Sequence, residues 1–178
     1  MSRLTDFYRG EATDAEGRTI DEIWAWDDEQ LEEVHDYIQW LFPTSTRSAY
    51  HPNAPVLTEE EIGVFRASSE LRGRLRQSFI RFLSFVGLAI LDHSRVVEGA
   101  NFDERCGEIW TYENHNWLRV SRVLASLCIL GLEEEAIGFL TWLNSAYLNG
   151  VIGSGDSGAR TQAAESLEHW ISQVTAPE

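Results

Sequence analysis

The sequence predicts an all-α protein, a single-domain irregular bundle or array of about six to eight helices. Apolar residues recur at helical spacings of three and four along most of the chain, and little of it alternates with the period of a strand. Short stretches with proline or glycine separate these helical patterns. The 178 residues, 43% of them hydrophobic, suit one compact core. We therefore expect residues 1–178 to form a single domain.

Four helical segments are predicted in the first half of the chain. Residues 28–42 carry an apolar stripe, and Pro43 ends it because proline lacks the backbone N–H and restricts the preceding residue. A loop with two prolines, 44–57, leads to Thr58, whose spacing to Glu61 is that of a capping box. The two other segments are a helical turn at 19–28 and a long helix at 69–85.

The second half predicts mainly long helices. Residues 88–99 are compatible with a short strand or hairpin, and Asn101 and Glu104 repeat the capping pattern before a short helix. Residues 115–130 and 131–150 predict two helices joined by a tight turn, which makes them antiparallel neighbours. A glycine-rich loop at 150–158 precedes a C-terminal helix at 159–175. Tetratricopeptide-like helical hairpins are the alternative architecture, although no second copy appears at that repeat length.

The charge of the chain argues against several partners and reactions. A net charge of -15 disfavours nucleic acid, which requires clustered cations, and it disfavours an anionic membrane surface. Residues 1–40 contain twelve Asp or Glu and three Arg, whereas residues 66–81 contain five Arg and one Glu, so we expect these segments to attract each other. All 14 basic residues are arginine, which excludes lysine Schiff-base chemistry and a Walker-type phosphate lysine.

Neither cofactor nor catalytic motifs stand out. Cys106 and Cys128 are isolated, so we expect buried free thiols rather than disulfides or a zinc site. Glu32 and His35 form one E-x-x-H element with no second copy, and a solvated helix face explains it better than a metal site. No nucleophile and base pattern is present, so we predict no enzyme and no cofactor. The absence of an apolar run of about 20 residues and of a signal peptide predicts a soluble, cytoplasmic protein.

The first of the two long antiparallel helices carries a cationic stripe. His115, Arg119 and Arg122 share one side of it at helical spacing, and apolar residues flank them on both sides. A helix this apolar is expected at the centre of the fold, where a guanidinium needs a carboxylate or several acceptors. The acidic first 40 residues supply candidates, and we expect Asp36 or Glu33 to fill this role.

Helical angles separate the aromatic residues of the stretch HDYIQWLFP. Trp40 lies nearly opposite the apolar stripe of its predicted helix, and Tyr37 and Gln39 lie on the two flanks. A tryptophan in this position either packs a second layer of the same protein or anchors a partner. The angles alone favour the second layer.

Four strings resemble the conserved region of the opioid growth factor receptor family. They are FYRG at 7–10, IDEIWAWDDEQLEEVHDYIQWLFP at 20–43, APVLTEEEIGVFRAS at 54–68 and ENHNWLRVSRVLASLCILGLEEEA at 113–136. Their order and spacing match the family over about residues 5–150, and YIQWLFP is an unusual string. The resemblance implies a receptor for the opioid growth factor, Met-enkephalin, with a role in growth regulation. The short chain is expected to be a stand-alone microbial member, for which enkephalin is not the expected ligand.

The leading hypothesis is a non-enzymatic binding domain for a peptide or small-molecule ligand. Tryptophan supplies stacking area, amides supply directional hydrogen bonds, and arginines grip a carboxylate such as a peptide C-terminus. The alternative is a structural or scaffold domain that acts through homo-oligomerisation or protein partners. The candidate ligand-binding residues are Tyr37, Gln39, Trp40, His115, Asn116, Arg119 and Arg122.

Overall fold

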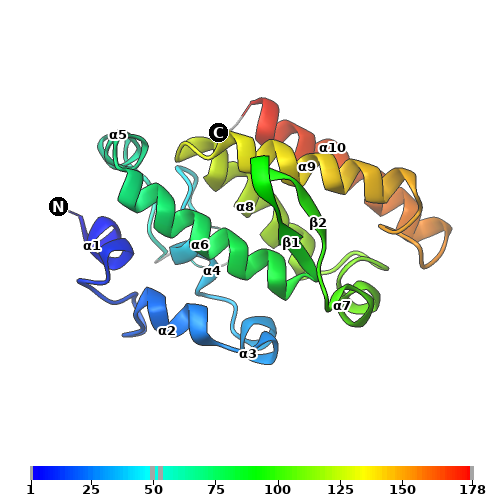
Figure 1. Cartoon of the computed structure of the whole chain (residues 1–178), viewed down its shortest axis with the longest axis horizontal. Helices are drawn as coiled ribbons and strands as arrows, with labels where there is room; N and C mark the ends of the chain where they lie inside the picture. The colour runs from blue at the N-terminus through cyan, green and yellow to red at the C-terminus, as the bar shows by residue number, and fades with distance from the viewer. Residues whose placement is uncertain (1, 49–50, 52–53, 177–178) are drawn as a thin grey trace.

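One long helix, α6, separates a group of short helices from a layer of three long ones (Figure 1). The computed structural model describes residues 2–48, 51 and 54–176, so part of the predicted loop at 44–57 lies outside the described residues. The helices are α1 (Arg3–Arg9), α2 (Ile20–Ala25), α3 (Asp28–Glu33), α4 (Ile38–Leu41), α5 (Glu59–Ala67), α6 (Ser69–Phe85), α7 (Phe102–Ile109), α8 (His115–Ile129), α9 (Glu133–Leu148) and α10 (Ser157–Thr175). A hairpin of β1 (Leu88–Ile90) and β2 (Val96–Glu98), with the 3-10 turn η1 (Asp92–Ser94) between them, completes the fold.

The predominantly helical fold confirms the predicted class, with more helices than expected. Within the described residues there are ten α-helices rather than six to eight. One addition is α1, which the sequence analysis did not predict. It begins with a capping box in which the hydroxyls of Ser2 and Thr5 each accept from the other residue's backbone N–H. The other addition comes from a helix that is broken.

The prediction of one continuous helix over residues 28–42 is wrong. Helix α3 ends at Glu33, Val34 is extended at φ -85° and ψ 130°, and the chain becomes helical again only at Ile38. The apolar stripe is real, but it is divided between two helices with different axes. A side chain from α8 stabilises this break by donating hydrogen bonds to its carbonyl groups, as described below. Tertiary hydrogen bonds therefore override the local helical pattern.

Helix caps follow the sequence at one predicted site and depart from it at another. Thr58 and Glu61 form the predicted capping box, in which the Thr58 hydroxyl accepts from the Glu61 N–H at 3.2 Å. Asn101 makes no such cap. Its Nδ2 donates instead to the Ser84 carbonyl at 2.9 Å, which ties the start of α7 to the end of α6.

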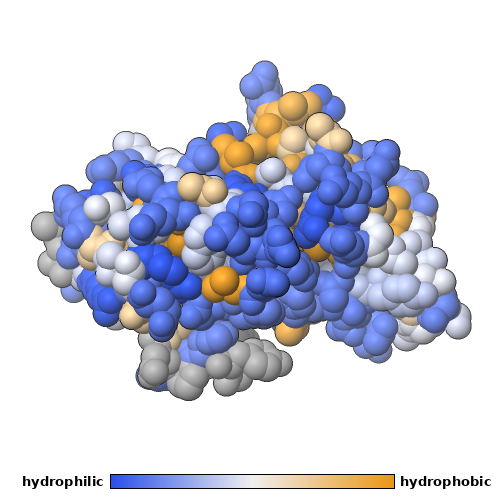
Figure 2. All heavy atoms as spheres, turned by 90° about the horizontal axis from the view of Figure 1, so that it is seen from below, coloured by the Kyte–Doolittle hydropathy of each residue, from blue (hydrophilic) through white to orange (hydrophobic). Residues whose placement is uncertain are grey.

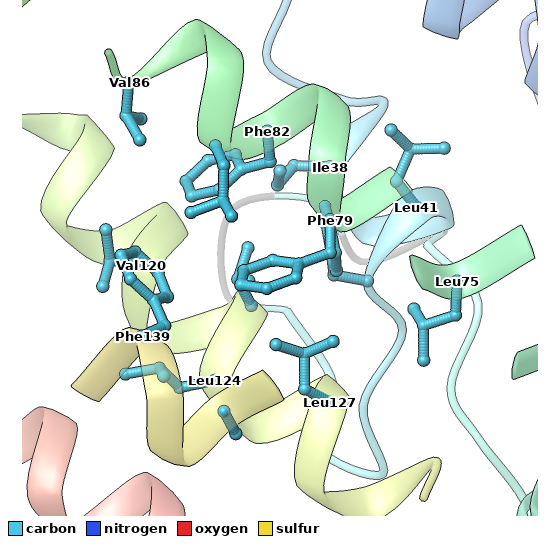
Figure 3. Close-up of a cluster of buried hydrophobic side chains, with 14 of the residues drawn as sticks. Ile38, Leu41, Leu75, Phe79, Phe82, Val86, Val120, Leu124, Leu127 and Phe139 are labelled. Carbon is cyan, nitrogen blue, oxygen red and sulfur yellow. The ribbon is translucent and has the colours of Figure 1, made fainter. Parts of the chain in front are cut away.

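The core lies where α6, α8 and α9 meet (Figure 3). Phe79 and Phe82 of α6 contact Phe139 of α9, with ring centroids 5.7 and 6.5 Å apart. Val120 and Leu124 of α8 are fully buried beside them. Each such side chain stabilises the fold by about 1.5–3 kcal/mol through burial.

The hairpin confirms the strand interpretation of residues 88–99. The strands β1 and β2 are antiparallel, with Ala89 opposite Val97. The hairpin follows α6 directly, and Figure 1 shows it diverging from that helix towards α9. It therefore bridges the two sides of the molecule.

Oppositely charged segments pair as the sequence predicts. Arg74 and Arg81 of α6 form ion pairs with Asp21 at 3.2 Å and with Asp28 at 2.8 Å. The face shown in Figure 2 is mostly hydrophilic, with hydrophobic residues in scattered groups. No helix in the described part of the chain is both long enough and apolar enough to cross a membrane.

The cysteines match the predicted free state and differ in burial. Both thiols are free, and Cys128 is buried, but Cys106 is only partly buried. Burial raises the pKa of the Cys128 thiol to about 11, so this cysteine is a protonated core residue at neutral pH.

Candidate ligand-binding cavity

A cavity of about 830 Å³ lies between α4, α8, α10 and the loop that follows α4. We call it the His-Arg cavity, because four of the five histidines and three arginines line it. These are His35, His51, His115, His169, Arg47, Arg119 and Arg122. Ile38, Leu118 and Ala125 form an apolar part of the wall, and Glu113 is an acidic lining residue. In a chain of net charge -15, such a concentration of cationic and titratable nitrogen favours an anion.

The seven residues predicted as ligand-binding do not all meet at this cavity. Gln39, His115, Arg119 and Arg122 line it. The other three predicted residues are Tyr37, Trp40 and Asn116, which make contacts elsewhere.

Trp40 packs against helix α1 rather than against α8. Its ring lies 5.2 Å from that of Phe7, edge to face, and the Arg3 guanidinium stacks 5.4 Å from its centroid. Only 6% of Trp40 is exposed. The second layer that helical angles favour is therefore the layer formed by α1.

Tyr37 is likewise a buried residue. Its hydroxyl donates to the Leu31 carbonyl at 3.2 Å, and its ring contacts that of Trp26. Burial raises the pKa of Tyr37 to about 12, so the phenol stays protonated at neutral pH. Both aromatic residues of the motif thus hold the short helices in place.

Arg119 stabilises the break between α3 and α4. The guanidinium is 5% exposed and donates to the carbonyls of Leu31 at 2.8 Å and Val34 at 3.0 Å, and to Asn116 Oδ1 at 3.0 Å. These carbonyls are free to accept because the chain leaves the helical path after Glu33. Several neutral acceptors therefore replace a carboxylate.

The carboxylates expected beside Arg119 are not its partners. Asp36 pairs instead with Arg18 at 2.8 Å, and the structure shows no bond from Arg119 to the Glu33 side chain among the described residues. The prediction of Asp36 or Glu33 is wrong because the break between α3 and α4 reorients the residues that follow it.

Glu32 does not line the cavity, but it contacts His115, which does. Its carboxylate accepts from Asn116 Nδ2 at 3.1 Å and lies 3.1 Å from His115 Nε2, although these last two groups are not aligned as a hydrogen bond. The rings of His35 and His115 are 4.9 Å apart. Burial, followed by the charge of Arg119, lowers the pKa of His115, and the negative charge of Glu32 partly offsets this decrease. Glu32 is a functional candidate that the E-x-x-H pattern signalled, and the described residues contain no group of three ligands that could hold a metal ion.

Gln39 and Arg122 present polar groups that the fold leaves available. Gln39 is 5% exposed, and its Oε1 has no hydrogen-bond partner among the described residues. Arg122 is half-buried, and its Nη1 donates to the Phe42 carbonyl at 3.3 Å and to Thr44 Oγ1 at 3.2 Å. Burial lowers the pKa of Arg122 from its ordinary high value. A buried acceptor without a donor and a partly desolvated cation, on the wall of one cavity, suit a ligand with both a donor and an anionic group.

Comparison with known proteins identifies the family. The family model described as "Opioid growth factor receptor (OGFr) conserved region" matches residues 3–151. The chain belongs to the opioid growth factor receptor family. The match includes α1 to α9, so of the long helices only α10 lies outside the family region.

Named relatives within the family are about one-third identical to this chain over the aligned residues. The opioid growth factor receptor of Mus musculus is 36% identical over 134 residues, and that of Homo sapiens is 35% identical; each match covers 72% of this chain. Opioid growth factor receptor-like protein 1 of Mus musculus is 35% identical over 123 residues. The chain spans about a fifth to a quarter of the length of these relatives, 21%, 20% and 26% respectively. No solved structure matches the chain.

The family region contains most of the cavity, but several of its lining residues are not among those predicted from the sequence. His35 was weighed only as a metal ligand, and His51 lies in a loop without a periodic pattern. His169 comes from α10, outside the family match. One usable signal was composition, because histidine is rare in this chain and its positions are otherwise unexplained.

Proposed function

We propose that the protein is a non-enzymatic binding domain that holds an anionic ligand, a peptide or a small molecule with a carboxylate, in the His-Arg cavity. One observation carries the proposal. Gln39 is 5% exposed, and its Oε1, which has no hydrogen-bond partner among the described residues, lies on the same cavity wall as Arg122. A buried carbonyl oxygen without a donor costs about 1–3 kcal/mol, which a ligand donor would recover. The guanidinium supplies a charge-assisted contact for the anion.

The names of the relatives support binding rather than catalysis. Those proteins are called receptors for opioid growth factor, and the same class of activity is our proposal for this chain. The identity of the ligand is a separate matter, because the chain spans only about a fifth of the receptors' length. We therefore propose the chemistry of the ligand, a carboxylate with a neighbouring hydrogen-bond donor, and no particular molecule.

A scaffold role is the second candidate, and one observation favours it. Arg119 and Asn116 use their polar groups on α3, the connecting segment and each other, so they join the N-terminal half of the chain to α8. In this candidate the same residues only maintain the fold, and activity resides in homo-oligomerisation or protein partners. A cytoplasmic location and the lack of a nucleic-acid partner remain predictions from composition in both cases.

Calorimetric titration with a panel of carboxylates separates the two candidates. The panel contains small organic acids and short peptides with either a free or an amidated C-terminus. We expect a free carboxylate to bind, and Arg122→Gln to weaken binding about 10-fold to 100-fold, since a charge-assisted hydrogen bond is worth about 1.5–3 kcal/mol. Gln39→Leu, which removes the unpartnered acceptor, is expected to weaken ligands that carry a donor beside the carboxylate.

The matched control for this titration is Arg95→Gln, which removes an exposed arginine outside the His-Arg cavity. It is expected to bind the same ligand as the wild type does. Equal binding by wild type, Arg122→Gln and Gln39→Leu, all folded, contradicts a site in this cavity. A panel in which nothing binds favours the scaffold candidate.

A further inference from the structure

The outer edge of β1 presents backbone groups that the rest of the chain does not use. Leu91 N–H donates to the Arg95 carbonyl and Gly99 N–H donates to the Gly87 carbonyl, both at 2.8 Å. Because bonded and non-bonded pairs alternate in an antiparallel ladder, Leu88 and Ile90 point their N–H and C=O groups away from β2. Neither residue makes a backbone hydrogen bond on that outer side within the described part of the chain.

This edge opens onto a second cavity, of about 840 Å³, on the side of α6. We call it the edge groove. Its walls are Ile80 and Ser84 of α6 on one side and residues 88–92 on the other. Figure 1 shows α6 and β1 diverging from their junction, so the free edge faces the space between them. The groove therefore combines an unpaired strand edge with a mixed wall, in which Ile80 is apolar and Arg76 and Ser84 are polar.

The strand lacks the usual protection of an exposed edge. Natural edges are commonly blunted by charged residues, proline or bulges. Residues 88–90 are Leu-Ala-Ile, which contain none of these. Leu88 is buried, Ala89 and Ile90 are partly exposed, and the next residue, Leu91, is 44% exposed, so the accessible part of the edge begins at Ala89. Such an edge is a template for another strand.

A cation without a partner lies at the same groove. Arg95 is exposed and lines the edge groove. Of the 14 arginines, all of which lie in the described ranges, it alone has a side chain with no hydrogen bond, ion pair or ring contact. In a chain with an excess of acidic residues, an unpaired guanidinium is available for an acidic group of a partner.

Helix α9 holds the hairpin in position, so the edge groove is already formed before a partner binds. A Cβ at Gly138 of α9 would lie 1.9 Å from the Ser94 carbonyl oxygen, so the turn η1 packs directly on the helix backbone. His93 and Ser94 in this turn have left-handed φ values of 58° and 56°, which the close packing maintains. A fixed edge loses little entropy when a peptide joins it.

We infer that the edge groove binds an extended, acidic segment of a partner protein, which joins β1 as an added strand. Backbone hydrogen bonds to the partly exposed Ile90 supply affinity, alternate apolar side chains enter the groove, and an acidic side chain pairs with Arg95. This inference does not depend on the His-Arg cavity, which lies between other helices.

A blocked peptide tests the inference without engaging the proposed carboxylate site. The probe is a fluorescein-labelled octapeptide of alternating valine and glutamate, acetylated and amidated so that it has no terminal carboxylate. We expect saturable binding by fluorescence anisotropy. We also expect Arg95→Glu to weaken it by about 10-fold or more, as reversal of a contacting charge does. Arg122→Gln is expected to leave binding unchanged, which separates this site from the His-Arg cavity.

Two further comparisons test backbone pairing. Ile90→Pro removes one outward N–H without breaking the hairpin ladder, and Ile90→Val is its matched control with the donor retained. Amide hydrogen exchange in the wild type gives an independent readout, because added peptide should slow exchange at Ile90. A version of the octapeptide with N-methylated backbone amides cannot pair as a strand. Supporting results are weaker binding by Ile90→Pro, loss of binding by this N-methylated peptide, and protection of the Ile90 amide.

Opposite results overturn the inference. These are no saturation at about 1 mM peptide, which corresponds to a free energy of only about -4 kcal/mol, equal binding of a valine-arginine peptide, or binding without protection of the Ile90 amide. The hydrogen-exchange outcome is measured on the wild type, so it tests the inference even if Ile90→Pro fails to fold.

Discussion

Replacing Arg119 with methionine should be among the most destabilising changes to a charged residue in this protein. Methionine keeps most of the length of the side chain and removes its donors. The guanidinium makes three contacts of 3.0 Å or less, to Leu31, Val34 and Asn116. Their loss leaves buried acceptors unpaired, at about 1–3 kcal/mol each with partial relaxation, so we expect about 3–5 kcal/mol in total.

This loss is large relative to the stability of a domain, which is about 5–15 kcal/mol. For a chain of this size it corresponds to a decrease in Tm of roughly 10 °C. Urea unfolding followed by circular dichroism gives the free energy of unfolding, and calorimetry gives the Tm. Arg119→Lys should recover little of the loss, because an ammonium group cannot reproduce the planar set of donors.

Variants of two other arginines serve as comparisons for the stability of Arg119→Met. Arg122→Met removes two longer bonds, 3.3 and 3.2 Å, from a half-buried side chain, and should cost about 1–2 kcal/mol. Arg95→Met removes an exposed side chain without partners and should change stability by less than about 0.5 kcal/mol. A free energy of unfolding for Arg119→Met within about 1 kcal/mol of the wild type would refute the reasoning, because this is the size of a single ordinary hydrogen bond.

Three other predictions concern pH, packing and the hairpin. Because the pKa of His115 is lowered in the folded state, the unfolded chain takes up the proton first, so stability falls as pH drops below the ordinary pKa of 6.5. Between about pH 8 and pH 5 the Tm should therefore fall less steeply for His115→Gln than for the wild type, and an equal slope contradicts this. Trp40→Ala should destabilise the protein by about 3–5 kcal/mol in urea unfolding while ligand binding in the His-Arg cavity persists, because the ring packs on Phe7 outside it. Gly138→Ala should lower the Tm and displace the hairpin in an NMR spectrum, because the new methyl group overlaps the Ser94 carbonyl; Gly107→Ala, at a helical position with open space, is the matched control.

The long helices were predictable because each is specified by its own periodic pattern. Helix α6 has the predicted range of residues 69–85, and α8 begins at His115 as expected. The C-terminal helix starts two residues earlier than predicted, because Asp156 of the glycine-rich loop caps it through its side chain. In these segments local propensity and tertiary packing favour the same structure.

The break after α3 was not predictable from local pattern. The stripe that includes Leu31 and Ile38 continues across it, and only a donor 88 residues away in sequence, Arg119, reveals where the chain leaves the helix. The expectation of a carboxylate partner failed for the same reason. It assumed that the segment presented its side chains to α8, whereas the segment presents its backbone carbonyls.

The break between α3 and α4 also determines which residues of HDYIQWLFP line the cavity and which pack in the core, and therefore which variants can test binding. The sequence predicts one shared site for Gln39 and Trp40, whereas in the structure Trp40 packs on α1 and Gln39 lines the His-Arg cavity. Arg119 stabilises the arrangement that creates this wall. A loss of ligand binding in an Arg119 variant would thus follow from either candidate function, because the cavity and the fold depend on the same bonds. Gln39 and Arg122 can be changed with less effect on the break, so their variants distinguish a binding site from a structural network.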